Sequence, residues 1–341
     1  MSDLDRTRLA DYLDTHFPEP GAALALERIG GGQSNPTWFV DWGNRRLVLR
    51  KKPAGEILKG AHAVEREFRV MQALADTVVP VPDVLRLEED TAILGTPFYL
   101  MERLEGWVFA DCALPGIPPA ERRAMYLSMA ETLARLHAVR PDAVGLGDFG
   151  RPGNYFERQI GRWSKQYAAS TGPRIPALDR LTEWLPANLP PDDGDVAIAH
   201  GDFRLGNMMF HPREPRVIAV LDWELSTLGH PLADLGFCVM TWRTRPDEYG
   251  GIRDLDREAL GIPSEAEFVA RYDEAARPTA PLLPFHIAFA FFRFAVIFVG
   301  IADRARAGNA ASGERAATLG PLAERFAVHG LEAVGLAPAA R

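Results

Sequence analysis

The sequence has few cysteines and lacks several patterns that mark common classes of functional site. Among its 341 residues only Cys112 and Cys238 are cysteine, and neither belongs to a Cys-x-x-Cys pair. A cysteine-based zinc site and a disulfide framework are therefore not indicated. The pattern G-x-x-x-x-G-K-[ST] does not occur either, which disfavours a Walker-type nucleotide site.

No long run of one charge sign occurs in the sequence. The formal net charge of −8 is spread over interleaved acidic and basic residues, so nucleic acid is not an expected partner. The first residues, MSDLDRTRLADYL, contain charges and no apolar core, which argues against a secretory signal and favours a cytoplasmic location. With 47% hydrophobic and 25% charged residues, the composition is typical of a folded globular protein.

One apolar stretch, from Leu282 to Ala302, raises the question of a membrane span. Arg293 would lie near the centre of that span, at a cost of about 2.5 to 3.5 kcal/mol. Pro284 and His286 weaken the case further. We therefore predict a buried core helix here and no membrane partner.

The N-terminal third is predicted to be rich in strands. A short helix over residues 1–17 precedes two strands joined by a turn at Asp41–Asn44, then a helix and two more strands. The predicted strands cover Glu27–Val40, Leu47–Lys51, Val84–Leu87 and Pro97–Met101, and the predicted helix covers Ala61–Leu74.

The pattern changes at Glu102–Gly106, where we predict a hinge between an N-terminal lobe, residues 1–105, and a C-terminal lobe, residues 106–341. The second lobe is predicted to be mostly helical, so the fold class is α+β. Its expected elements are helices over Ala120–Val139, Tyr155–Ala169, Ile175–Trp184 and from Asp234 onward, and strands over Val196–Ala199 and Val217–Leu221.

The strongest chemical signal is the sequence HGDFRLGN, residues 200–207, which follows a predicted strand. Asp222 comes fifteen residues after Asn207, at the end of another strand. Two carboxylates and an amide at strand ends can hold a divalent ion against phosphate oxygens while one carboxylate faces an acceptor hydroxyl. Asp202, Asn207 or Asp222 taken alone would be an ordinary turn residue, but their joint spacing favours chemistry.

With these residues in place, the sequence resembles the aminoglycoside phosphotransferase family, which is related to protein kinases. The resemblance covers nearly the whole chain. It is carried by GGGQSNPTWFV, LVLRKKP, VEREFRVMQAL, VPVPDVL, PFYLMERLEG, HGDFRLGNMMF and VLDWELSTLGHPLADLGF, in that order. The sequence is most similar to the branch associated with acyl-CoA dehydrogenases. The resemblance implies a two-lobed protein-kinase-like fold, with an antiparallel sheet and one helix in the N-lobe.

The resemblance also implies roles for the residues of the motif. Asp202 resembles the catalytic aspartate that orients the attacking hydroxyl, and Arg204 stands where a cation can stabilise charge during transfer. Asn207 and Asp222 resemble the two Mg²⁺ ligands. Asp234 resembles a buried aspartate that anchors the catalytic loop. His200 resembles the family's structural histidine, and a general base is the alternative for it.

ATP is the implied cofactor, and the loop over its phosphates falls at Gly31, Gly32 and Ser34. Glycine lets backbone N–H groups approach phosphate closely, although three glycines between strands are as readily a hairpin turn. Adenine is expected to hydrogen-bond the hinge backbone at Glu102 and Leu104.

The family's cation on the third strand falls on Arg50, where many relatives carry lysine. Arginine keeps the charge but differs in geometry, and Lys52 lies on the same face of the strand, so both remain candidates for the phosphate contact. Glu67 matches the acid that pairs with this cation, with Glu65 as the alternative.

The implied reaction is transfer of the γ-phosphoryl group to a hydroxyl group of a small molecule. The branch suggests a hydroxyacyl compound or acyl-CoA as acceptor, and an aminoglycoside is the alternative. We expect the acceptor to enter over Asp202 from the helical side, near Trp223, Trp242 and the helix that contains Arg293. A nucleotide-binding module without turnover, a pseudokinase that regulates a partner, is the alternative from another class. A protein kinase is disfavoured because no extended activation segment lies between Leu221 and Asp234.

Overall fold

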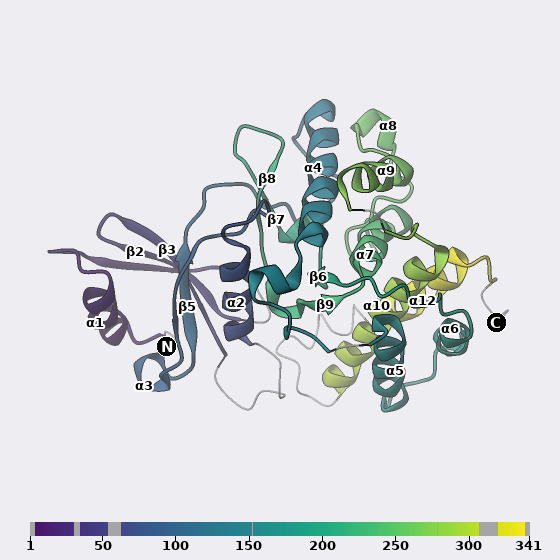
Figure 1. Ribbon diagram of the computed structural model, residues 1–341, viewed down its shortest axis with the longest axis horizontal. Coiled ribbons are helices and arrows are strands. Elements are labelled where there is room, and N and C mark those ends of the chain that lie inside the picture. The colour runs from purple at the N-terminus through teal and green to yellow at the C-terminus, as the bar shows by residue number, and fades with distance from the viewer. Residues whose placement is uncertain are drawn as a thin grey trace. The chain divides into compact units, whose positions relative to one another are not determined.

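The computed structural model describes residues 4–30, 35–53, 63–151, 153–277, 279–306 and 320–337. The chain divides into two compact units. Unit 1 comprises Met1–Trp107 and Met208–Ser226, and unit 2 comprises Val108–Asn207 and Thr227–Arg341. An antiparallel sheet dominates unit 1 and helices dominate unit 2 (Figure 1), which confirms the predicted α+β class.

A five-stranded antiparallel sheet forms the body of unit 1. Its strand order is β1-β2-β3-β5-β4. Arg50 of β3 lies opposite Thr37 of β2 and Tyr99 of β5, so it occupies the central strand of the sheet. The strands cover Leu24–Arg28 (β1), Thr37–Trp42 (β2), Arg45–Lys51 (β3), Val84–Glu88 (β4) and Phe98–Glu102 (β5).

The single strand predicted over Glu27–Val40 is wrong, because the structure has two strands there. β1 ends at Arg28 and β2 begins at Thr37. Gly30 and Pro36 lie in the interval, and neither residue supports a continuous strand, because glycine lacks a side chain to pack and proline lacks a backbone N–H. The predicted turn at Asp41–Asn44 is confirmed in part, with Gly43 at a left-handed φ of +56°.

The part of unit 1 that precedes residue 107 also has three helices in its described residues. α1 (Arg6–His16) is capped by Asp5, whose side chain accepts hydrogen bonds from two backbone N–H groups. α2 (Val64–Leu74) packs on β4 and β5, and the short α3 (Thr91–Leu94) contacts α1. Apolar residues of α1 and the sheet form a core that includes Leu13, Trp38 and Phe98.

Residues 208–226 return to unit 1 as the hairpin of β7 (Met208–Phe210) and β8 (Val217–Val220) and the short 3₁₀ helix η3 (Trp223–Leu225). Trp107 pairs with Phe210 through backbone hydrogen bonds of 2.8 and 2.9 Å. A Cβ atom on Gly106 would lie 2.6 Å from the Phe210 carbonyl oxygen. The end of the predicted hinge segment is therefore joined to β7, and glycine allows the close approach.

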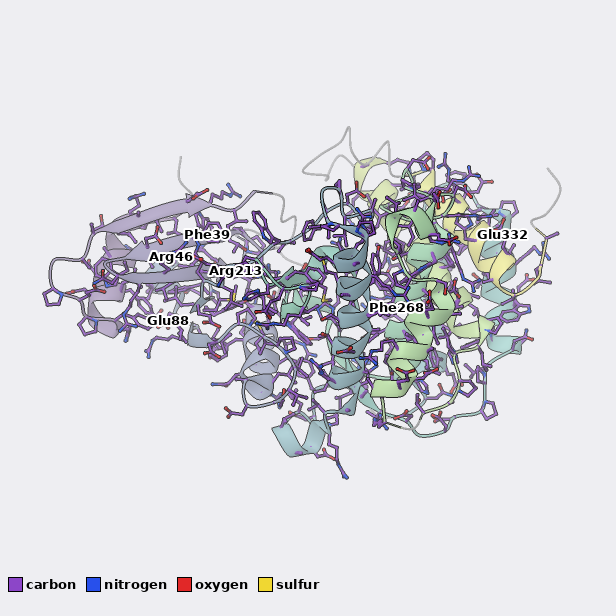
Figure 2. The ribbon with its side chains drawn as sticks, turned by 90° about the horizontal axis from the view of Figure 1, so that it is seen from above. Phe39, Arg46, Glu88, Arg213, Phe268 and Glu332 are labelled. Carbon is purple, nitrogen blue, oxygen red and sulfur yellow. The ribbon has the colours of Figure 1, made fainter. Side chains whose placement is uncertain are left out.

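Unit 2 consists of helices around a two-stranded sheet of β6 (Ala197–Ala199) and β9 (Thr227–Gly229). α9 begins with a capping box between Ser264 and Glu267. Phe268 of this helix, labelled in Figure 2, is fully buried. Among its described residues, the helices of unit 2 are α4 (Pro119–Ala138), η1 (Pro141–Val144), α5 (Tyr155–Ala168), α6 (Pro176–Ala187), η2 (Leu205–Asn207), α7 (Pro231–Arg243), α8 (Arg257–Leu260), α9 (Glu265–Ala275), α10 (Pro284–Arg306) and α12 (Leu322–Ala333).

The apolar stretch at residues 282–302 forms the core helix α10. Within the described residues it is the one helix long and apolar enough to cross a membrane, and 78% of its most apolar window is buried inside the protein. α10 packs against α5, α6, α7 and α12 (Figure 1). The Arg293 guanidinium donates a hydrogen bond to the carbonyl oxygen of Gly201, so the charge has a partner within unit 2.

Candidate active site

In unit 1, Arg50 lies between two carboxylates. Its Nε atom is 2.8 Å from Glu67 Oε2, and its Nη2 atom is 2.7 Å from Asp222 Oδ1. Only 15% of the Arg50 side chain is exposed. The central strand β3, helix α2 and the segment after β8 therefore bring one cation into contact with two acids, of which Glu67 is buried and Asp222 is 32% exposed.

Glu67 is held by more than its ion pair. Asn35 Nδ2 donates to Glu67 Oε1 at 2.6 Å, and the Tyr99 hydroxyl donates to Glu67 Oε2 at 3.1 Å. Burial raises the pKa of Glu67 to about 7, although the Arg50 charge opposes the shift. Asn35 and Tyr99 are functional candidates that the sequence analysis missed, because no local spacing links them to Glu67.

We predict opposite effects of acid on activity and on stability at Glu67. Protonation below pH 7 removes the charge that faces Arg50, so phosphoryl transfer should fall as the pH drops through about 7. The raised pKa means that folding favours the proton, so this stabilising contribution is present below the usual value of 4.5 and is lost as the pH rises through about 7. Rate profiles and unfolding free energies over pH, measured for the parent and Glu67→Gln, check both trends.

The conservative variant Tyr99→Phe provides the control for that prediction. The Tyr99 hydrogen bond lowers the pKa of Glu67, so its loss should move the midpoint of the profile to higher pH. Glu67→Gln should flatten the profile. Profiles of the same midpoint in all three proteins would show that another group titrates.

Lys52 has a different partner from Arg50. Its Nζ atom lies 2.6 Å from Glu65 Oε1, and both side chains are partly exposed. The two alternatives left open by the sequence thus form separate pairs in the structure, Arg50 with Glu67 and Lys52 with Glu65.

Asp222 sits on a strained turn at the end of β8. Its backbone is left-handed, with φ +65° and ψ +61°, a conformation that aspartate and asparagine tolerate better than most residues. The next residue, Trp223, is fully buried, and its indole N–H donates to the Val220 carbonyl oxygen at 2.9 Å. The buried indole anchors the turn that carries the Asp222 carboxylate.

In unit 2, Asp234 of α7 holds the loop that follows β6. Its carboxylate accepts from the backbone N–H groups of His200, at 2.6 Å, and Gly201, at 2.9 Å. Burial disfavours the ionised form, but His137 and His200 outweigh it and keep the pKa of Asp234 below its usual value. Gly201 has a left-handed φ of +83°, which explains the glycine at this bend.

Asp202, Arg204 and Asn207 come together beyond that bend. Asn207 Nδ2 donates to the Asp202 carbonyl oxygen at 2.9 Å and to Asp202 Oδ2 at 2.8 Å. Arg204 Nε lies 3.2 Å from the same Oδ2. The Asp202 side chain is 23% exposed, so the carboxylate is oriented and still reaches the surface of unit 2.

Several other predicted site residues have simpler surroundings. Gly31, Gly32 and Ser34 lie outside the described residues. Glu102 Oε1 accepts from the Asp83 backbone N–H at 2.9 Å, and Leu104 lies in the partly buried segment after β5. Among the residues that the structure describes, no group of three or more His, Cys, Asp or Glu side chains is arranged to hold a metal ion.

The expectation that the acceptor contacts Trp223 and Trp242 needs correction. Trp223 is fully buried and Trp242 is 6% exposed, and each indole N–H donates to a backbone carbonyl. The two indole rings pack in the protein core, so they do not present a surface to a ligand. Arg293 donates a hydrogen bond to the Gly201 carbonyl oxygen in the loop after β6.

The phosphotransferase enzyme family model matches residues 25–284, which include every polar residue described above for the candidate site except Arg293. The chain belongs to this phosphotransferase family. A crystal structure from Ralstonia eutropha, provisionally described as an aminoglycoside phosphotransferase, is 45% identical, with a TM-score of 0.87 over 97% of this chain and 98% of that chain. The predicted kinase-like fold is therefore confirmed.

This phosphotransferase also matches part of much longer proteins. Rat acyl-CoA dehydrogenase family member 11 is 43% identical over 94% of this chain and 42% of its own length. The chain spans between 28% and 43% of the acyl-CoA dehydrogenase family members that it matches. Spectinomycin phosphotransferase shares the fold, with 11% identity and a TM-score of 0.64 over 97% of this chain and 98% of that chain.

Proposed function

We propose that the chain is an ATP- and Mg²⁺-dependent kinase that transfers the γ-phosphoryl group to a hydroxyl group of a small molecule. The observation that carries the proposal is Asp202, whose carboxylate is oriented by Asn207 and Arg204 in a loop anchored by Asp234. A carboxylate in this setting can accept a hydrogen bond from an acceptor hydroxyl and take its proton late in transfer.

Unit 1 supplies the residues proposed for the nucleotide. Arg50 would contact the α- and β-phosphates, Glu67 would hold Arg50, and the hinge backbone at Glu102 and Leu104 would bind adenine. The phosphate loop with Gly31, Gly32 and Ser34 remains part of this proposal. Spectinomycin phosphotransferase, which has the same fold, was crystallised with ADP and spectinomycin, and this supports nucleotide use. The proposed lobes stay residues 1–105 for the nucleotide and residues 106–341 for the catalytic loop, the metal site and the acceptor.

Asn207 and Asp222 fit the requirements of a hard divalent cation, which prefers oxygen ligands. The Asn207 amide nitrogen donates hydrogen bonds to Asp202. The amide oxygen is therefore the atom of this side chain that could bind a metal ion. Asp222 offers a carboxylate that already faces a cation, Arg50. Bound Mg²⁺ would screen the phosphate charge and orient the β- and γ-phosphates.

The acceptor is proposed to be a hydroxyacyl compound or acyl-CoA. The support is the similarity to acyl-CoA dehydrogenase family members, whose sequences contain a region like this chain. The test is incubation with ATP and Mg²⁺ and, separately, hydroxyacyl-CoAs and aminoglycosides, followed by mass measurement of the products. A mass gain of one phosphoryl group on a hydroxyacyl-CoA is expected, and its absence from every acceptor would reject the kinase proposal.

The direct contact between Arg50 and Asp222 favours one alternative, a pseudokinase that binds nucleotide without turnover. If Arg50 stays paired with the Asp222 carboxylate, it would compete with a metal ion for that carboxylate. The alternative predicts that the protein binds ATP and labels no acceptor in a metabolite extract.

We predict that Arg50, rather than Lys52, binds the nucleotide phosphates. Arg50→Gln should weaken ATP binding by about 10- to 100-fold, the usual range for a lost hydrogen bond to a charged group. Lys52→Gln should change it by less than about threefold, because Lys52 pairs with Glu65 and not with the Glu67 and Asp222 carboxylates that contact Arg50. Calorimetric titration with ATP and Mg²⁺ measures both.

Arg46→Gln is the matched control for that pair of variants. Arg46 lies on the same strand as Arg50, but its side chain is 49% exposed and pairs with Glu105. Thermal unfolding of each variant shows whether the fold is kept, since Arg50→Gln leaves Glu67 buried without its cation. If Lys52→Gln weakens ATP binding more than Arg50→Gln does, Lys52 rather than Arg50 binds the phosphates.

A further inference from the structure

Tyr249 is a large aromatic residue held at the surface of unit 2 in an unfavourable backbone conformation. Its φ is +72°, in the left-handed region, and its residue is 48% exposed. A non-glycine residue occupies this region at a cost in free energy, and the surroundings must hold it there. Such positions concentrate at functional sites.

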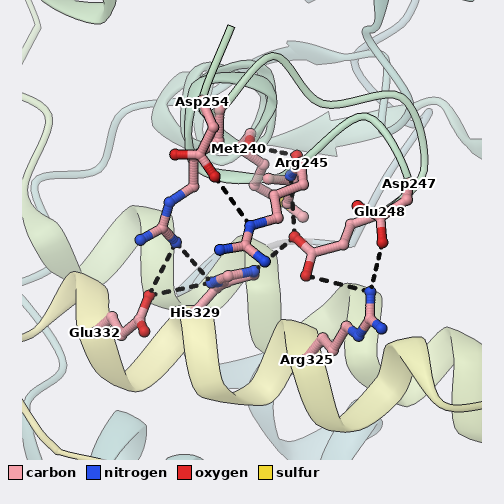
Figure 3. Close-up of polar contacts among 10 residues, drawn as sticks. Met240, Arg245, Asp247, Glu248, Asp254, Arg325, His329 and Glu332 are labelled. Carbon is pink, nitrogen blue, oxygen red and sulfur yellow. Dashed lines mark hydrogen bonds and ion pairs between the residues drawn. The ribbon is translucent and has the colours of Figure 1, made fainter.

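The loop of residues 245–254, which carries Tyr249, is held by polar contacts, of which those made by arginines are ion pairs (Figure 3). Most of these contacts join the loop to α12, and one closes the loop on itself. They are His329 with Glu248 at 2.9 Å, Arg325 with Asp247 at 3.0 Å and with Glu248 at 3.6 Å, Arg253 with Glu332 at 3.4 Å, and Arg245 with Asp254 at 3.0 Å. The loop is therefore fixed from several sides, which allows it to hold a strained residue.

The Arg204 side chain links the Tyr249 ring to Asp202. It packs edge-on against Phe294 and Phe298 of α10, with ring centroids 5.1 and 5.4 Å apart. The Arg204 guanidinium carbon lies 5.8 Å from the ring centroid, and Arg204 Nε contacts Asp202 Oδ2 at 3.2 Å. The two phenylalanines are buried, whereas about half of Tyr249 faces outward.

From this arrangement we infer that Tyr249 determines acceptor specificity, forming with Arg204 a wall against which the apolar arm of the acceptor packs next to its reacting hydroxyl. The inference rests on the proposed function, since it takes Asp202 as the group that meets the hydroxyl. An exposed ring fixed on rigid supports gives apolar contact area with little loss of conformational entropy.

The charges of the loop argue that this acceptor carries no ammonium groups on the side facing Tyr249. An acceptor rich in amines would need carboxylates as partners. The acids Asp247, Glu248 and Asp254 of the loop are each paired with an arginine or histidine that holds the loop in place. The wall thus consists of an aromatic ring and the Arg204 cation, which suits an acyl arm better than an aminosugar.

The experiment compares the parent with Tyr249→Gly and Tyr249→Phe, using long- and short-chain hydroxyacyl-CoAs and an aminoglycoside as acceptors. Glycine removes the ring and suits the left-handed backbone, so the fold is kept. We expect Tyr249→Gly to raise KM for the long-chain acceptor by about tenfold, the effect of one lost aromatic contact, and to leave KM for ATP unchanged. Tyr249→Phe should behave like the parent.

Leu85→Ala is the matched control, because Leu85 is 42% exposed and lies on β4 in unit 1. Acceptor KM values within twofold of each other for the parent and Tyr249→Gly would overturn the inference and leave the kinase proposal intact. Preference of the parent for the aminoglycoside would overturn the acceptor class. Transfer by the parent to none of the acceptors would reject the proposed function and the inference with it.

Discussion

Replacing Asp202 with asparagine is expected to lower the rate of phosphoryl transfer by about 10²- to 10⁴-fold, the usual contribution of a positioned acid or base. Asparagine preserves the size of the side chain but cannot accept the proton of the acceptor hydroxyl. ATP binding should remain close to that of the parent, because the residues proposed for the nucleotide phosphates lie elsewhere in the sequence. Product formation and calorimetric ATP titration measure the two quantities.

Asp303→Asn is the control for this substitution. Asp303 is 25% exposed and pairs with Arg306, much as Asp202 is 23% exposed and pairs with Arg204. Its replacement should leave transfer unchanged, so a loss confined to Asp202→Asn identifies the position rather than the change of charge. Full activity of Asp202→Asn would remove Asp202 from the proposed mechanism.

Replacing Asp222 with asparagine is expected to impair both nucleotide binding and transfer. Asparagine tolerates the left-handed backbone at this turn, so the substitution removes mainly the charge. A carboxylate that helps hold Mg²⁺ against phosphates contributes several kcal/mol, and transfer should therefore fall by about 10³-fold. The apparent affinity for ATP, measured with and without Mg²⁺, should differ less in the variant than in the parent.

Asp179→Asn tests whether any loss follows from removing an arginine-paired acid. Asp179 is 33% exposed and pairs with Arg174, whereas Asp222 is 32% exposed and pairs with Arg50. The Mg²⁺ dependence of ATP binding should be unchanged in Asp179→Asn. If Asp222→Asn keeps the same Mg²⁺ dependence as the parent, the residue is not a metal ligand.

Local patterns in the sequence were sufficient to predict most helices and several strands. Apolar residues at helical spacing indicated the helix that includes Val64, Met71 and Leu74, and the structure has α2 over Val64–Leu74. The division between β1 and β2 was missed although the sequence carries a signal for it, because Gly30 and Pro36 stand between the apolar residues of the two strands and both residue types are typical of strand ends.

The candidate site was predictable where its residues lie close together in the sequence. Asp202 and Asn207 are separated by five positions and are in contact in the structure. Asn35 and Tyr99, which hold Glu67 from 32 positions away on either side, left no signal because tertiary packing creates their contacts. Trp223 and Trp242 were misjudged for a related reason, since composition does not tell a buried tryptophan from an exposed one.

The return of residues 208–226 to unit 1 affects how this chain can be made and divided. Asp222 and the hairpin paired with Trp107 are translated about a hundred residues after the rest of unit 1. Residues 108–207 of unit 2 must therefore be synthesised before the last segment of unit 1, so the two units cannot fold one after the other as independent domains during translation. A truncated gene that stops at Trp107 would encode Arg50 and Glu67 without Asp222, one of the two groups that Arg50 contacts.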